Sequence, residues 1–135
     1  MAMEEVTYEV LVNRWKKEVR SSQLAKLDPS FYTAVDDHIR TLQADFDREY
    51  QVNPQSAKAM ILQDELRNLS KVRDDLYEVR EKKILMAALA AARGSNIDKT
   101  PLTRGETDLF EDLERVLREG SHQDFLLADL VQVVP

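Results

Sequence analysis

The sequence predicts an all-α fold, an elongated helical bundle with one very long third helix. Apolar residues recur every three or four positions along most of the chain, the spacing of one face of an α-helix. Three glycines and four prolines among 135 residues leave little turn material, and β-branched residues do not form alternating runs. Charged residues make up 33% of the chain, above the roughly 25% of an ordinary domain, which indicates exposed helix faces rich in ion pairs.

The first helix is expected within residues 4–22. Its apolar stripe contains one large aromatic side chain and consists of Val6, Val10, Leu11, Trp15 and Val19. Basic residues occupy the positions between, at Arg14, Lys16, Lys17 and Arg20.

Four acidic residues of the same segment dilute this positive charge, namely Glu4, Glu5, Glu9 and Glu18. We therefore expect a solvated face, because a charge run on a helix is usually exposed to water. Direct DNA binding would need a larger basic surface, formed by Arg14, Lys17 and Arg20 together with Lys71, Arg73, Lys82 and Lys83.

The second helix is expected to open at Asp28 and Pro29. Aspartate can accept hydrogen bonds from free amides at a helix start, and proline fits the first turn because its missing N–H would be unpaired there. The apolar side chains then step by three and four positions, at Tyr32, Val35, Ile39, Leu42 and Phe46. This spacing predicts a helix packed nearly parallel to a neighbour.

The third helix is expected to run from the start signal Asn53-Pro54 to Gly94, which suits a left-handed C-cap. Roughly forty residues at 1.5 Å each give a rod of about 60 Å. Its first half has a one-sided stripe, formed by Met60, Leu62, Leu66, Leu69, Val72, Leu76 and Val79. Residues 84–92 carry no polar side chain, so this part must be surrounded by other segments.

The fourth helix is expected to open at Thr103 and Glu106, which have the spacing of a capping box, and to end at Gly120. Its buried face consists of Leu109, Phe110, Leu113, Val116 and Leu117. The sequence then changes to a segment rich in leucine and valine that stops at Pro135 before a strand pairing could be completed.

Composition narrows the function further. The chain has no cysteine, which excludes disulfides, thiolate metal ligands and a cysteine nucleophile, and indicates a reducing, intracellular setting. A formal net charge of −6 argues against nucleic-acid binding over a broad surface. The amino end does not look like a secretory signal, and the longest apolar run is less than half of a membrane span, so we expect a soluble protein.

The sequence gives only weak evidence for a catalytic or metal-binding site. His38 has no ligand partner three or four positions away, and Glu119 with His122 straddles a helix end without a second copy of the motif. No glycine-rich phosphate loop occurs either. We therefore expect a protein that is not an enzyme, with no catalytic residues, cofactor or metal.

Three stretches together are similar to the GINS subunits of archaeal and eukaryotic replication forks. "LAKLDPSFYTAVDDHIRTL" resembles the opening of their second helix. "LYEVREKKILMAALAAARG" and "LTRGETDLFEDLERVL" resemble their most specific signature, an arginine-led turn, a Lys-Ile-Leu entry to an alanine-rich helix end, and then Leu-Thr-x-x-Glu. The likeness extends from about Tyr8 to Pro135.

The resemblance implies a non-catalytic scaffold. GINS is a tetramer, homotypic or two-plus-two in archaea, that holds the MCM helicase and a RecJ-like protein together and links them to primase or polymerase. It implies a helical domain over residues 1–120, with 121–135 as a linker and the start of a truncated C-terminal β-domain. It also implies an archaeal cytoplasm, or a nucleus if the source is eukaryotic.

We assign residues to two surfaces on this basis. The core within the chain is expected at Phe31, Tyr32, Ile84, Leu85, Leu89, Leu102, Leu109, Phe110 and Leu113. The interface between subunits is expected at Val10, Trp15, Val19, Leu62, Leu66, Leu69 and Tyr77. Trp15 has an equally good alternative role, which is to close the chain's own core.

Two other classes of function remain as alternatives. A generic helical adaptor or coiled-coil structural protein would share the helices but would not bind a replicative helicase. An enzyme with a carboxylate or metal site would need a concave polar pocket that shifts the pKa of its carboxylates.

Overall fold

The computed structural model describes residues 6–120 and confirms the all-α prediction. Its four helices are α1 (Tyr8–Arg20), α2 (Phe31–Val52), α3 (Ala57–Ala92) and α4 (Arg104–Gly120). The third is the longest, with 36 residues, or roughly 54 Å at 1.5 Å per residue. The tail, for which we expected a linker and the start of a β-domain, lies outside the described residues.

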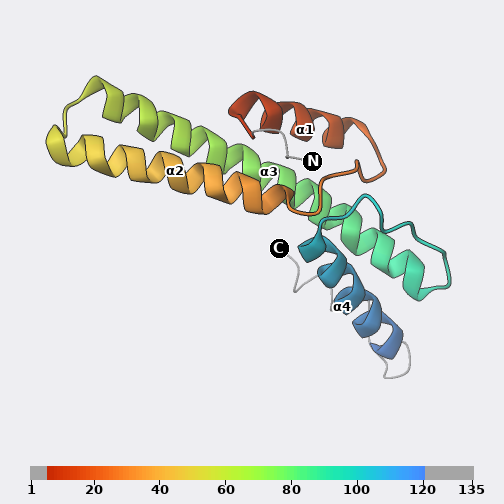
Figure 1. Cartoon of the computed structure of the whole chain (residues 1–135). Helices are drawn as coiled ribbons and strands as arrows, with labels where there is room; N and C mark the ends of the chain where they lie inside the picture. Colours follow the sequence, from red (N-terminus) through yellow and green to blue (C-terminus); the bar gives the residue numbers. More distant parts are fainter. Residues whose placement is uncertain (1–5, 121–135) are drawn as a thin grey trace.

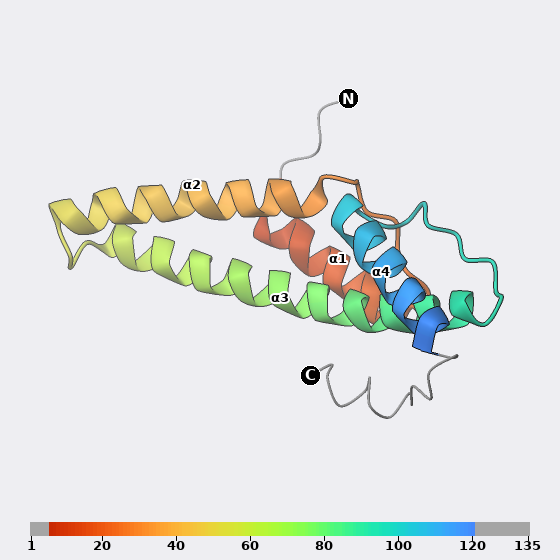
Figure 2. The ribbon, with the colours of Figure 1, turned by 90° about the horizontal axis from the view of Figure 1, so that it is seen from below.

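The long helix α3 is the spine of the molecule, and it contacts each of the other three described helices (Figure 1). Helix α2 runs antiparallel beside its N-terminal half, and α4 packs on its C-terminal half (Figure 2). Helix α1 lies against the middle of α3. Among the described helices no other pair packs together, so the shape is an elongated rod with side pieces.

The core consists of two clusters placed one after the other along α3. The first lies between α1, α2 and the N-terminal half of α3, and contains Val6, Leu11, Leu27, Phe31, Val35, Leu42, Leu62, Leu69 and Leu76. The second lies between α3, α4 and the loop before α4, and contains Ile84, Ala88, Ala91, Leu102, Phe110 and Leu117.

The starts of α2 and α3 differ from the prediction. Each begins later, at Phe31 and Ala57. The Asp28 carboxylate accepts from the Ser30 N–H at 2.8 Å, and the Asn53 side chain accepts from the Gln55 N–H at 3.0 Å. The side chains expected to cap therefore close a turn just before each helix, as Asp and Asn commonly do.

The end of α3 and the start of α4 follow the prediction. Gly94 has φ of +103°, and the N–H groups of Gly94 and Ser95 donate to the carbonyls of Ala91 and Ala90. This is the Schellman arrangement that favours glycine. At α4, the Thr103 N–H donates to Glu106 and the Glu106 N–H donates to the Thr103 hydroxyl, so the capping box forms.

The apolar end of α3 is covered largely by this chain's own segments. Ile84, Ala88 and Ala91 are buried in the second cluster, and Leu24 and Ile97 from the two flanking loops pack there too. Met86 is the exception, with 62% of its surface exposed. The expectation that other segments surround residues 84–92 is therefore met on most sides of the helix, and the side of Met86 stays open. No described helix has the length and apolar character needed to cross a bilayer.

Candidate functional site

A buried arginine joins all four helices. Arg80 of α3 is 0% exposed. Its guanidinium holds Glu106 of α4 through two hydrogen bonds of 2.7 Å each and Glu18 of α1 through one of 2.7 Å. It also donates to the backbone carbonyls of Ala25 and Pro101. We call this group, with Tyr32 and Lys83 described below, the Arg80 joint.

Glu106 is held in place from three directions. One carboxylate oxygen accepts from the Thr103 N–H at 3.0 Å as part of the capping box, and the other accepts from the Tyr32 hydroxyl of α2 at 3.2 Å. Both oxygens also accept from Arg80. The helix cap and the buried ion pair thus share one carboxylate, which ties the start of α4 to α3 and α2.

Glu18 is held in a similar way. Its carboxylate accepts from Arg80 and from the Lys83 ammonium at 2.6 Å, and the Ala25 N–H donates to it at 3.2 Å. Lys83 also donates to the backbone carbonyls of Glu18 and Gln23. The loop between α1 and α2 is therefore fixed to α3 by polar contacts.

The electrostatics keep the joint in one charge state. Burial by itself lowers the pKa of Arg80, but the hydrogen bonds and charges of Glu106 and Glu18 outweigh it, so the pKa lies above its ordinary value. Burial and the nearby Glu106 carboxylate raise the pKa of Tyr32 far above 10.0. Arg80 therefore stays protonated and Tyr32 stays neutral across the physiological range.

The joint is closed to solvent and internally satisfied. Glu18 and Glu106 are 1% and 3% exposed, and no buried side-chain polar atom among the described residues is without a partner. A buried ion pair mainly costs desolvation, so its role is to specify one arrangement of the helices more than to add stability. The buried ion pairs of the joint thus link α1, α3 and α4 in one arrangement.

Sequence reasoning missed this centre, although the pattern contained a signal. Arg80 stands four residues after Leu76 and four before Ile84, so it lies on the buried face of α3. Glu18 stands seven residues after Leu11 and lies on the buried face of α1. Charged residues at core positions of two helices, with opposite signs, indicate a buried pair.

The predicted core residues fall at three levels of burial. Four are buried, namely Phe31, Ile84, Leu102 and Phe110. Four are partly buried against the two clusters, namely Tyr32, Leu89, Leu109 and Leu113. Leu85 is partly exposed and belongs to neither cluster.

The predicted interface residues fall into two groups. Leu62 and Leu69 are buried within the chain, and Leu66 and Trp15 pack against the same cluster, because α1 and α2 cover that stripe of α3. Leu62 and Leu69 are therefore buried by this chain itself, and Trp15 packs partly buried against the same core. Val10 is partly exposed, whereas Val19 and Tyr77 are exposed by 54% and 41%.

Four of the seven basic residues that direct DNA binding was expected to need form ion pairs in the structure. On α3, Lys71 pairs with Asp75 and Arg73 with Asp36. Lys82 pairs with Glu78, and Lys83 is part of the Arg80 joint. The described residues also contain no group of acidic and histidine side chains that could hold a metal.

A hollow of about 630 Å³ lies beside the Arg80 joint, with Lys83 among its lining residues. Apolar side chains such as Leu24, Met86 and Ile97 line it together with polar and charged ones. Asp98 is one of its lining residues, and hydrogen bonds from Thr100 lower the pKa of this carboxyl.

Comparison with known proteins adds no identification. No family model matches the chain, and no curated protein or solved structure matches it.

Proposed function

We propose that this chain is a non-catalytic subunit of a GINS complex. In this role it is a scaffold in the replicative helicase assembly, holding the MCM ring and a RecJ-like protein together during initiation and fork progression. The proposal begins from the three stretches that resemble GINS subunits, and the helical architecture is compatible with it.

The observation that carries the proposal is that all three stretches contribute to the Arg80 joint. The first supplies the Ala25 carbonyl and the Tyr32 hydroxyl, the second supplies Arg80 and Lys83, and the third supplies Glu106. Residues from the three stretches therefore belong to one structural unit, which supports the interpretation of the stretches as a single signature. A shared joint is a reason for a family of helical subunits to keep these stretches in one order.

Sister subunits would bind the exposed apolar residues that the interface assignment retains. Val19 on α1 and Tyr77 on α3 keep this role in the proposal. Exposed apolar side chains on a charged surface are typical of contact sites between proteins.

A pull-down with the MCM ring and the RecJ-like protein of the source organism tests the proposal. We expect the tagged chain to retain both, with sister subunits present when the complex is heterotypic. The proposal is wrong if a folded chain retains neither, and that outcome favours the generic helical adaptor.

The subunit contact has its own control. Val19→Asp with Tyr77→Asp is expected to lower the assembly mass measured by light scattering. Met86→Asp changes an even more exposed apolar residue outside the assigned interface and is expected to leave the mass unchanged. Equal masses for all three proteins would remove Val19 and Tyr77 from the interface.

A further inference from the structure

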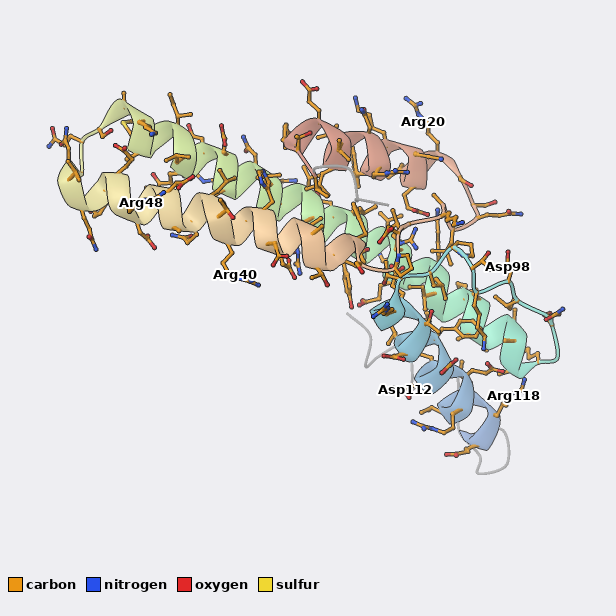
Figure 3. The ribbon with its side chains drawn as sticks, viewed as in Figure 1. Arg20, Arg40, Arg48, Asp98, Asp112 and Arg118 are labelled. Carbon is orange, nitrogen blue, oxygen red and sulfur yellow. The ribbon has the colours of Figure 1, made fainter. Side chains whose placement is uncertain are left out.

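We propose that the outer face of α1 docks an acidic, amphipathic segment of a partner protein. This face is defined by Asn13, Lys16, Lys17 and Arg20, which are all exposed and share one side of the helix by their spacing. Among the described helices α1 contacts α3 alone, and the face lies opposite that contact. Arg20 points away from the rest of the molecule (Figure 3). The four residues that define this face are not part of the subunit contact assigned above, whereas Val19 borders both surfaces.

The cations of this face differ from those of the neighbouring helices in having no counter-charge. Every lysine and arginine of α2 and α3 forms an ion pair, from Arg40 with Asp37 to Lys83 with Glu18. Within residues 6–120, Lys16, Lys17 and Arg20 have no carboxylate partner. The positive charge of α1 is therefore available to another molecule.

The fold itself creates this excess of charge. The sequence places Glu18 among the cations of α1, where it would be expected to dilute them. In the structure the Glu18 side chain is buried, and its carboxylate pairs with Arg80 and Lys83. Glu9 is then the one acidic residue left on the solvent side of α1. Lys16, Lys17 and Arg20 thus form a positive strip on a chain whose formal net charge is −6.

Apolar surface borders the same strip. Tyr8 is 45% exposed and Val19 is 54% exposed. Next to Lys16 a shallow hollow of about 330 Å³ is lined by Tyr8, Val12 and Lys16, together with Glu9 and Asn13. Positive charge beside the exposed apolar side chains of Tyr8 and Val19 matches a segment that presents acidic and apolar side chains together.

A nucleic acid fits this surface less well than a protein segment. Phosphate binding gains affinity from many cations along an extended path, and here three lie within two turns of one helix. A polyanion long enough to be bound also approaches the acidic remainder of the chain, which repels it within a Debye length of about 8–10 Å. A short acidic segment can cover the three cations without approaching the acidic remainder of the chain.

Selection from a displayed library of random peptides of about 16 residues, enough for four helical turns, tests the proposal. The selection compares the wild-type protein with Lys16→Glu/Lys17→Glu/Arg20→Glu. The matched control is Arg40→Glu/Arg48→Glu/Arg67→Glu, which reverses three exposed cations on other helices. Circular dichroism checks that all three proteins are folded.

We expect the wild type and the control to enrich peptides with net negative charge and interspersed leucine or phenylalanine. Fluorescence anisotropy should then show about tenfold weaker binding of these peptides to the α1 variant, from the loss of three ion pairs. Val19→Ser should weaken binding as well, whereas higher salt should weaken it for the wild type and the control alike.

Two results overturn the proposal. One is enrichment of the same peptides, or of none, by the wild type and the α1 variant. The other is tighter binding of a single-stranded or duplex oligonucleotide of about 20 nucleotides than of any selected peptide, when that binding is lost in the α1 variant. The second result assigns the face to nucleic acid.

Discussion

Arg80 is the central residue of the buried polar network that links the helices. From α3 it contacts Glu18 of α1 and Glu106 of α4 in buried ion pairs, and Glu106 in turn accepts a hydrogen bond from Tyr32 of α2. Removing one partner of a buried ion pair leaves the other charge without compensation, whereas removing an exposed pair changes little. Helix α3 contains an arginine of each kind, so the two costs can be compared within a single helix.

Arg80→Ala is expected to destabilise the fold by about 3–5 kcal/mol, because the buried carboxylates of Glu18 and Glu106 lose their main partner. Arg67→Ala, which breaks an exposed pair with Asp64 on the same helix, should cost less than about 1 kcal/mol. Urea denaturation measures both. Equal losses would contradict the role assigned to Arg80.

Tyr32 gives the joint a signature at alkaline pH. The raised pKa means that the folded chain keeps the phenol proton above pH 10, where the unfolded chain releases it. The unfolded state therefore binds fewer protons, so this residue's contribution to stability is present below about pH 10 and falls as the pH rises further.

Tyr32→Phe is accordingly expected to lessen the fall in stability above about pH 10, while costing about 1–2 kcal/mol near neutral pH through the lost hydrogen bond to Glu106. Urea denaturation over a pH series compares the variant with the wild type. Parallel pH profiles for the two proteins would show that Tyr32 titrates normally in the fold.

At the scale of the elements, the boundaries of α3 and α4 rest on local chemistry. Gly94 ends α3 in a left-handed conformation, whereas Gly105 lies inside the first turn of α4. A Cβ added at either position would meet no atom within 4 Å. The two glycines therefore differ in backbone conformation alone, and they should respond to alanine with opposite signs.

Gly94→Ala is expected to destabilise the chain by about 1 kcal/mol, because alanine is strained at a φ of +103°. Gly105→Ala is expected to stabilise it by about 0.5–1 kcal/mol, because alanine restricts the unfolded chain and favours the helix. Thermal unfolding of both variants checks the signs. A stabilising Gly94→Ala would mean that α3 does not end in this motif.

Features of these elements that depend on nearby residues could be predicted from the sequence, whereas features that depend on distant residues could not. The four helices, the Gly94 cap and the Thr103–Glu106 box depend on neighbours in the chain, and the sequence predicts them. The later starts of α2 and α3 depend on competing turns at Asp28 and Asn53, which share the sequence signals of a helix cap. The Arg80–Glu18 pair joins residues 62 positions apart, so one helix pattern alone cannot reveal it.

At the scale of the whole molecule, one long helix carries three others on its sides, and each end of it has its own apolar cluster. The Arg80 joint sits where the clusters meet and fixes how the helices are placed. The surface left outside carries paired charges on α2 and α3, an unpaired positive strip on α1, and scattered apolar side chains such as Val19 and Tyr77. These features suit a protein that binds other proteins.

Sedimentation velocity of the purified chain with the MCM ring and the RecJ-like protein tests the central claim most directly. The account predicts that the three migrate as one faster complex, and that the ring and the RecJ-like protein separate when the chain is left out. A chain that sediments at its own unchanged rate in the mixture, while circular dichroism shows it folded, would contradict the account.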